Sequence, residues 1–147
     1  MEGKYALGHV HLKVRNLDRA MVFYTRLLDF KITERAGRYL FLTYGDRHHE
    51  LAIHEVASDA ALPDRKGVGL YHFAIEIPDT RALKALYHRL READVDVKPM
   101  DHGISKVLYF SDPDGNDVEA YVDTRIENDR FEWRGESSPL DTNALPD

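Results

Sequence analysis

Two stretches decide the fold, HVHLKV (residues 9–14) and YHFAIEI (residues 71–77). The first alternates polar and apolar side chains, which is typical of a half-buried strand, and the second is also predicted to be a strand. Successive side chains of a strand point to opposite faces, so the apolar residues of the alternating stretch share one face. In the first stretch these residues are Val10, Leu12 and Val14. The chain therefore contains two strands of the same kind, one in each half.

A helix is predicted after each of these strands. Asn16 can cap the first helix, and Asp79 or Thr80 can cap the second. Apolar residues at helical spacing then form one side of each helix. They are Leu17, Ala20, Met21, Tyr24, Leu27 and Leu28 in the first, and Leu83, Leu86, Tyr87 and Leu90 in the second.

Three further strands are predicted after each helix. The runs are FKITER, RYLFLTY and HHELAIHEV in the first half, and VDVKP, KVLYF and DVEAYV in the second. Aligning the halves with an offset of 63 residues pairs four identical residues: His9 with His72, Tyr24 with Tyr87, Arg26 with Arg89 and Leu27 with Leu90. The order of elements and these matches indicate one βαβββ module written twice.

The predicted fold class is therefore α+β, built from paired βαβββ modules. Neither module can bury enough apolar surface alone, so we expect the two to pack as a single domain over residues 1–123. Module one covers about 5–56, a linker 57–68 and module two about 69–123. The tail, 124–147, is polar and lacks periodicity; it is either disordered or anchored by Phe131, Trp133 and Leu140.

The amino-acid composition excludes several classes of partner and of chemical site. The formal net charge of -6, with scattered basic residues, argues against a nucleic-acid partner. The absence of cysteine excludes disulfides, thiolate metal sites and a cysteine nucleophile. No apolar run approaches the ~20 residues of a membrane span, and the first residues lack a signal peptide's apolar core. We therefore expect a cytoplasmic protein without membrane contact.

Three side chains that can bind a metal lie on the first strand of each half and on the last strand of the second half. His9 and His72 open the first strands of the two halves, and Glu119 lies on the last strand, in the stretch DPDGNDVEAYV (residues 112–122). If the halves are related by approximate two-fold symmetry, the imidazoles can converge and Glu119 can complete the set. Two histidines and one carboxylate form the facial triad of non-haem iron(II). A metal would also offset the cost of burying the carboxylate.

Three segments resemble the signatures of the vicinal oxygen chelate superfamily. They are LGHVHLKVRNLDRAMVFYTRLLDF, YHFAIEI and YFSDPDGNDVEAY, and the resemblance covers residues 5–123. The superfamily includes glyoxalase I, fosfomycin-resistance proteins, bleomycin-binding proteins and extradiol dioxygenases. Membership implies a curled mixed sheet around a metal cleft, with metal ligands at His9, His72 and Glu119.

Other residues resemble those of the extradiol dioxygenases. The pair His48–His49 suggests His49 as the acid–base group, and Tyr109 stands ten residues before Glu119, as in that group. His102 resembles a pocket-entrance residue; Tyr121 and His11 are predicted to line the substrate pocket. The resemblance implies cleavage of a catechol-type aromatic by O2, with Fe(II) bound, or else Mn(II), Ni(II) or Zn(II). Relatives of this length are commonly homodimers.

Two other functions stay open. In glyoxalase I two histidines and two glutamates bind the metal, and Glu50 can be aligned as the fourth ligand, giving a lyase or a fosfomycin-resistance-like transferase. Strand parity favours Glu50 over His49 in the cleft, because Leu51 and Ile53 would then face the core; a bulge at His48–His49 would reverse this. The third function is a metal-free, bleomycin-resistance-type binding protein.

Overall fold

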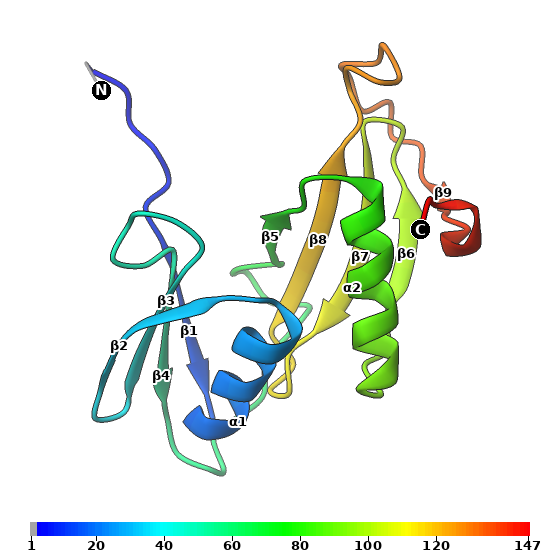
Figure 1. Ribbon diagram of the computed structural model, residues 1–147. Helices are drawn as coiled ribbons and strands as arrows, with labels where there is room; N and C mark the ends of the chain where they lie inside the picture. The colour runs from blue at the N-terminus through cyan, green and yellow to red at the C-terminus, as the bar shows by residue number, and fades with distance from the viewer. Residues whose placement is uncertain (1–2) are drawn as a thin grey trace. The chain divides into compact units, whose positions relative to one another are not determined.

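The computed structural model describes residues 3–147, so the first two residues of the predicted domain lie outside the described part. The chain divides into two compact units, Met1–Pro63 and Asp64–Asp147. Each unit contains one βαβββ module with its own mixed sheet (Figure 1). The predicted α+β class and the duplicated module are therefore confirmed, with two sheets rather than one continuous sheet.

The first unit has a four-stranded sheet in the order β1-β4-β3-β2. Strands β1 and β4 are parallel, and the other neighbours are antiparallel. The elements are β1 (Val10–Val14), α1 (Leu17–Val22), a π-helical turn η1 (Phe23–Leu27), β2 (Lys31–Ala36), β3 (Tyr39–Thr43) and β4 (Leu51–Glu55).

The second unit repeats this arrangement and adds a short edge strand. Its sheet has the order β5-β8-β7-β6-β9, with β5 parallel to β8 and the other pairs antiparallel. The elements are β5 (Phe73–Glu76), α2 (Thr80–Glu92), β6 (Lys98–Asp101), β7 (Ser105–Ser111), β8 (Asp117–Asp123), β9 (Ser138–Pro139) and a 3-10 turn η2 (Thr142–Ala144). No helix within residues 3–147 is long and apolar enough to span a membrane.

Both helices begin at the predicted caps. The Asn16 side chain accepts a hydrogen bond from the Arg19 amide at 2.9 Å, and Asp79, rather than Thr80, accepts one from the Ala82 amide at 2.8 Å. Asp94 has a positive φ of 59° just after α2, and the Val95 amide donates to the Leu90 carbonyl at 3.0 Å. This C-cap explains why the strand predicted at VDVKP begins only at Lys98.

Helix α2 covers one face of the second sheet and leaves the other face for polar side chains. Figure 1 shows α2 lying along β7 and β8. Burial alternates along β8: Val118, Ala120 and Val122 are buried, whereas Glu119 and Tyr121 are half-buried. The helix contributes Leu83, Leu86 and Leu90 to the same core. Burial of this apolar face forces Glu119 and Tyr121 to the opposite one.

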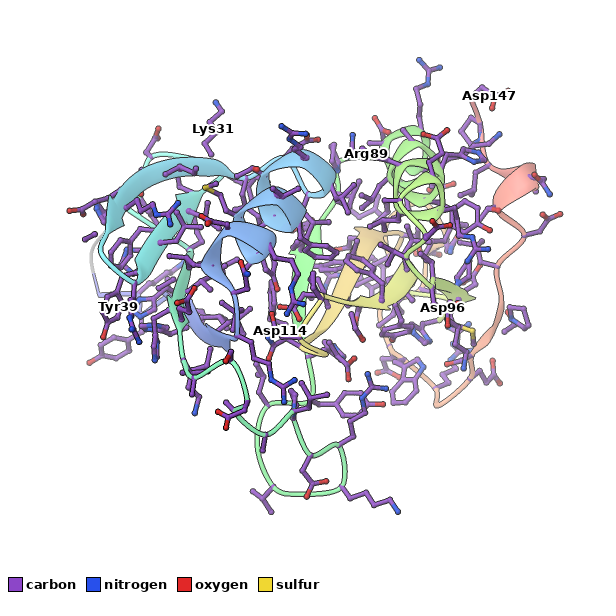
Figure 2. All side chains as sticks on the ribbon, turned by 90° about the horizontal axis from the view of Figure 1, so that it is seen from below. Lys31, Tyr39, Arg89, Asp96, Asp114 and Asp147 are labelled. Atoms are coloured by element: carbon purple, nitrogen blue, oxygen red, sulfur yellow. The ribbon has the colours of Figure 1, made fainter. Side chains whose placement is uncertain are left out.

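The C-terminal segment is ordered, and Leu140, one of its three expected anchors, is half-buried with its amide donating to the Pro99 carbonyl at 3.3 Å. Phe131 and Trp133 remain largely exposed, and the buried residues are Thr142 and Leu145. Strand β9 pairs with β6, with Ser138 opposite Asp101. Lys84 of α2 donates to the Leu145 carbonyl at 3.0 Å and to the carboxylate of Asp147, the residue labelled in Figure 2. The segment is therefore attached to the sheet edge and to α2.

The N-cap of α2 gives a stability test. Asp79→Ala removes the acceptor for the Ala82 amide, so the free energy of unfolding should fall by about 1 kcal/mol. Chemical denaturation measures the change. Asp96→Ala, at a fully exposed position beyond the helix, is the matched control and should have a much smaller effect. Equal losses in the two variants would contradict the assigned cap.

Candidate active site

The second unit brings His72 and Glu119 into direct contact. His72 immediately precedes β5, and Glu119 pairs with Ala74 in the parallel β5–β8 ladder. His72 Nε2 lies 2.8 Å from Glu119 Oε2, and the two side chains are 26% and 13% exposed. An imidazole nitrogen and a carboxylate oxygen thus converge at a partly desolvated position, which is the donor chemistry that first-row divalent metals prefer.

Tyr109 lies beside this pair. It is the cross-strand partner of Glu119 in the β7–β8 ladder, and its hydroxyl hydrogen-bonds to the Glu119 carboxylate. Its ring centroid lies 5.8 Å from that of His72. Burial, followed by the charge of Glu119, raises the pKa of Tyr109 to about 12. The phenol is therefore protonated at neutral pH and available as a hydrogen-bond donor.

His102, which follows β6, continues the polar chain from Tyr109. Its Nε2 lies 2.8 Å from the Tyr109 hydroxyl, and its Nδ1 lies 2.6 Å from Ser137 Oγ. The Trp133 ring stands edge-on at 6.3 Å. Sequence reasoning did not identify Ser137, because it lies in a polar tail whose two-residue strand β9 has no periodic signal.

Tyr121 lies on the same face as Glu119, as the strand alternation predicts. Burial is the main cause that raises its pKa, and the negative charge of Glu76 adds to the effect. Tyr121 thus presents a neutral aromatic ring beside the carboxylate. This position suits the predicted role as an aromatic wall.

The first unit groups His9 with His49. His9 immediately precedes β1, and its ring centroid lies 4.5 Å from that of His49. The Phe41 ring, which the sequence did not single out, lies 5.0 Å from His49. Burial, then the charges of His9 and His48, lower the pKa of His49. His49 is therefore neutral at pH 7 and can accept a proton.

A chain of hydrogen bonds fixes the orientation of His49. Glu34 Oε2 lies 2.9 Å from His48 Nε2, and His48 Nδ1 lies 2.9 Å from His49 Nδ1. Because a carboxylate only accepts, His48 donates from Nε2, and in the tautomer that carries its proton there its Nδ1 accepts from His49 Nδ1–H. The proton of neutral His49 is then on Nδ1, which leaves Nε2 as the basic nitrogen.

Glu50 is engaged elsewhere. Strand β4 begins at Leu51, so the three preceding residues form no regular strand and parity does not choose between His49 and Glu50. The Tyr44 amide donates to Glu50 Oε2 at 3.3 Å, which directs the carboxylate to the turn after β3. The Thr33 hydroxyl, at the bulge between Ile32 and Glu34 of β2, donates to the His48 carbonyl at 2.6 Å and holds this irregular segment.

His11 lies further along the same face. Its Nε2 is 3.0 Å from His54 Nδ1, and the Tyr39 ring, labelled in Figure 2, lies 5.3 Å from the His54 ring. Burial, followed by the charge of His54, lowers the pKa of His11. His11 is thus a neutral aromatic side chain on the sheet face opposite the buried Leu12, which suits the predicted pocket-lining role.

The strand register identifies the first-unit counterpart of Glu119. Ala74 pairs with Glu119, and His11, the repeat equivalent of Ala74, pairs with Ala52. The structural equivalent of Glu119 is therefore Ala52, not Glu50. The duplicated modules contribute equivalent histidines but only one equivalent carboxylate.

Part of the predicted ligand set is thus assembled within one unit. His72 and Glu119 fit a divalent metal by donor type, distance and burial. His9 belongs to the other unit, where it contacts His49. Within the described residues no group of three or more histidine, aspartate or glutamate side chains is placed to hold a metal ion. Coordination by all three residues remains a prediction.

Residues 6–120 match the family model described as Glyoxalase/Bleomycin resistance protein/Dioxygenase superfamily, and the chain belongs to this superfamily. A crystal structure of a glyoxylase/bleomycin resistance protein/dioxygenase domain from Frankia sp. EAN1pec shares the fold. Its TM-score is 0.70 at 26% identity, over 82% of this chain and 99% of that chain. The resemblance read from the sequence is therefore confirmed.

Relatives within the superfamily have different activities. Catechol-2,3-dioxygenase of Bacillus subtilis (strain 168) is 38% identical over 80% of this chain and 41% of its own length. Lactoylglutathione lyase of Neisseria meningitidis is 28% identical over 77% of this chain and 87% of its own. Glutathione transferase FosA of Serratia marcescens also matches at 28%. The chain spans only 41% to 63% of the length of the first dioxygenase relatives it matches.

Metal affinity tests the His72–Glu119 pair. Glu119→Gln removes the anionic donor, so the dissociation constant for Mn²⁺ or Co²⁺ should rise at least about tenfold in calorimetric titrations. The control is Glu76→Gln, because Glu76 is an exposed carboxylate on the adjacent strand β5, and its affinity should be unchanged. Unaltered binding by the Glu119 variant would exclude this carboxylate as a ligand.

Proposed function

We propose that the protein is a metal-dependent extradiol dioxygenase that cleaves the ring of a catechol-type aromatic with O2. His9, His72 and Glu119 are the proposed ligands, and Fe(II) is the proposed metal. The single observation that carries this choice is the alanine at position 52, where the repeat places the counterpart of Glu119. A set of two histidines and one carboxylate leaves three positions of an octahedral ion for substrate and oxygen.

His49 is the proposed acid–base group. Its Nδ1 is hydrogen-bonded to His48, whose other nitrogen is held by Glu34, so Nε2 can take a proton from a substrate hydroxyl. A neutral imidazole with a lowered pKa is suited to this step at neutral pH. The first two members of the Glu34–His48–His49 chain keep the base in one tautomer and one orientation.

Tyr109 and Tyr121 are the proposed substrate contacts in the second unit. Tyr109 can exchange its Glu119 acceptor for a substrate oxygen, and His102 holds the phenol from the other side. Tyr121 offers a ring for packing against an aromatic substrate, and His11 offers another in the first unit. When bound, Fe(II) supplies Lewis acidity toward the two vicinal oxygens and reactivity with O2.

Lactoylglutathione lyase activity is the second candidate, favoured by the match over 87% of that relative's length. This activity requires Glu50 as a fourth metal ligand. The hydrogen bond between the Tyr44 amide and the Glu50 carboxylate would then have to break. A metal-free, bleomycin-resistance-type binding protein is the third candidate.

We further propose that the protein is a cytoplasmic homodimer. Light scattering should then give a mass twice the chain mass of 16.9 kDa.

Paired variants separate the roles of His49 and Glu50. His49→Ala should retain metal and lower kcat by about 10²–10⁴-fold, because it removes the acid–base group. Glu50→Gln is the matched control and should retain both metal and turnover, since its carboxylate only caps a turn. Metal content by mass spectrometry and steady-state kinetics provide the measurements. Loss of metal in the Glu50 variant would support the lyase instead.

Anaerobically purified protein allows a direct choice among the three functions. Iron together with a yellow ring-opened product from catechols is the expected result. Nickel or zinc, with turnover of a thiol-aldehyde adduct and none of catechols, would overturn the dioxygenase proposal. Protein that takes up no divalent metal would support the binding protein.

A further inference from the structure

We propose that Ser137, in the C-terminal segment, is a positioning residue that fixes the tautomer of His102 and thereby the orientation of the Tyr109 hydroxyl. The expected effect on turnover rests on the proposed function, whereas the expected effect on the tautomer of the His102 imidazole does not. The structural basis is a continuous chain of four hydrogen-bonding groups in the second unit: Ser137, His102, Tyr109 and Glu119.

The direction of each hydrogen bond follows from the acceptor at one end. The Glu119 carboxylate only accepts, so the Tyr109 hydroxyl donates to it. The Tyr109 oxygen is then free to accept from His102 Nε2–H at 2.8 Å. A neutral imidazole with its proton on Nε2 has a lone pair on Nδ1, and Ser137 Oγ donates to that nitrogen at 2.6 Å. The donors and acceptors along the chain from Ser137 to Glu119 are therefore mutually consistent.

The surrounding segment holds Ser137 in place. The Trp133 indole N–H donates to the Glu136 carbonyl at 2.9 Å, and the Trp133 ring stands edge-on to His102. Ser138, the next residue, pairs with Asp101 through β9 and β6. Ser137 is therefore fixed between an indole contact on one side and a strand pair on the other.

The loop that carries His102 is also bound to this segment. Asn128 Nδ2 donates to the Gly103 carbonyl at 2.9 Å. Gly103 has a φ of +79°, and a Cβ at this position would overlap the Arg130 guanidinium, so only glycine lets the guanidinium pack over the loop. His102, Arg130 and Ser137 line a polar cavity of about 490 Å³. The segment thus forms the outer wall of the His102 site.

Nuclear magnetic resonance of the imidazoles tests the assignment without any turnover. Full-length protein labelled with ¹⁵N-histidine is compared metal-free and Zn²⁺-loaded, with His102→Gln identifying the His102 signals. Wild-type protein and Ser138→Ala, the matched exposed control, should show His102 with its proton on Nε2. Ser137→Ala should move these signals toward a mixture of tautomers, and Ser137→Thr, which keeps a hydroxyl, should restore them.

A second variant and a kinetic readout complete the test. Trp133→Phe removes the N–H that holds Glu136 and should shift the His102 signals in the same direction as Ser137→Ala. Catechol turnover should fall about threefold to tenfold in Ser137→Ala, as expected for one lost hydrogen bond. His102 signals in Ser137→Ala identical to those of Ser138→Ala would overturn the inference. Absence of catechol turnover in wild-type protein would instead refute the proposed function.

Discussion

The site depends on the parallel pairing of the first and last strands in each module. In the second unit this pairing sets β5 beside β8, so the residue before β5, His72, meets the Glu119 carboxylate at 2.8 Å. In the first unit β1 lies beside β4, and His9 meets the residues that lead into β4. A residue at a strand entrance is thereby brought next to one that is 40 positions away in the first unit and 47 positions away in the second.

The two modules use this constraint differently. The second places a carboxylate, Glu119, where the first has the buried Ala52. The first instead places His49 against its strand-entrance histidine, in an irregular segment that Glu34 and Thr33 hold from β2. The second module therefore supplies a carboxylate, and the first instead places the His9 ring against the His49 ring. This asymmetry favours a single-carboxylate metal site over one with two carboxylates.

The sequence was sufficient for the two modules and the helix caps, because strand alternation and helical spacing are local signals and the 63-residue offset aligns the two halves. It could not choose between His49 and Glu50, since parity presumes a regular strand and β4 begins only at Leu51. Ala52 could be identified as the counterpart of Glu119 only from the strand register, which depends on residues from distant parts of the chain. Ser137 was also missed, because a two-residue edge strand in a polar tail leaves no pattern to detect.

Anomalous diffraction at the iron edge, from crystals grown anaerobically with Fe(II), tests the central claim most directly. We predict one anomalous peak within bonding distance of His72 Nε2, Glu119 and His9, with Glu50 and His49 outside the ligand shell. A peak that Glu50 coordinates, or one at which Glu119 is not a ligand, would contradict the single-carboxylate site.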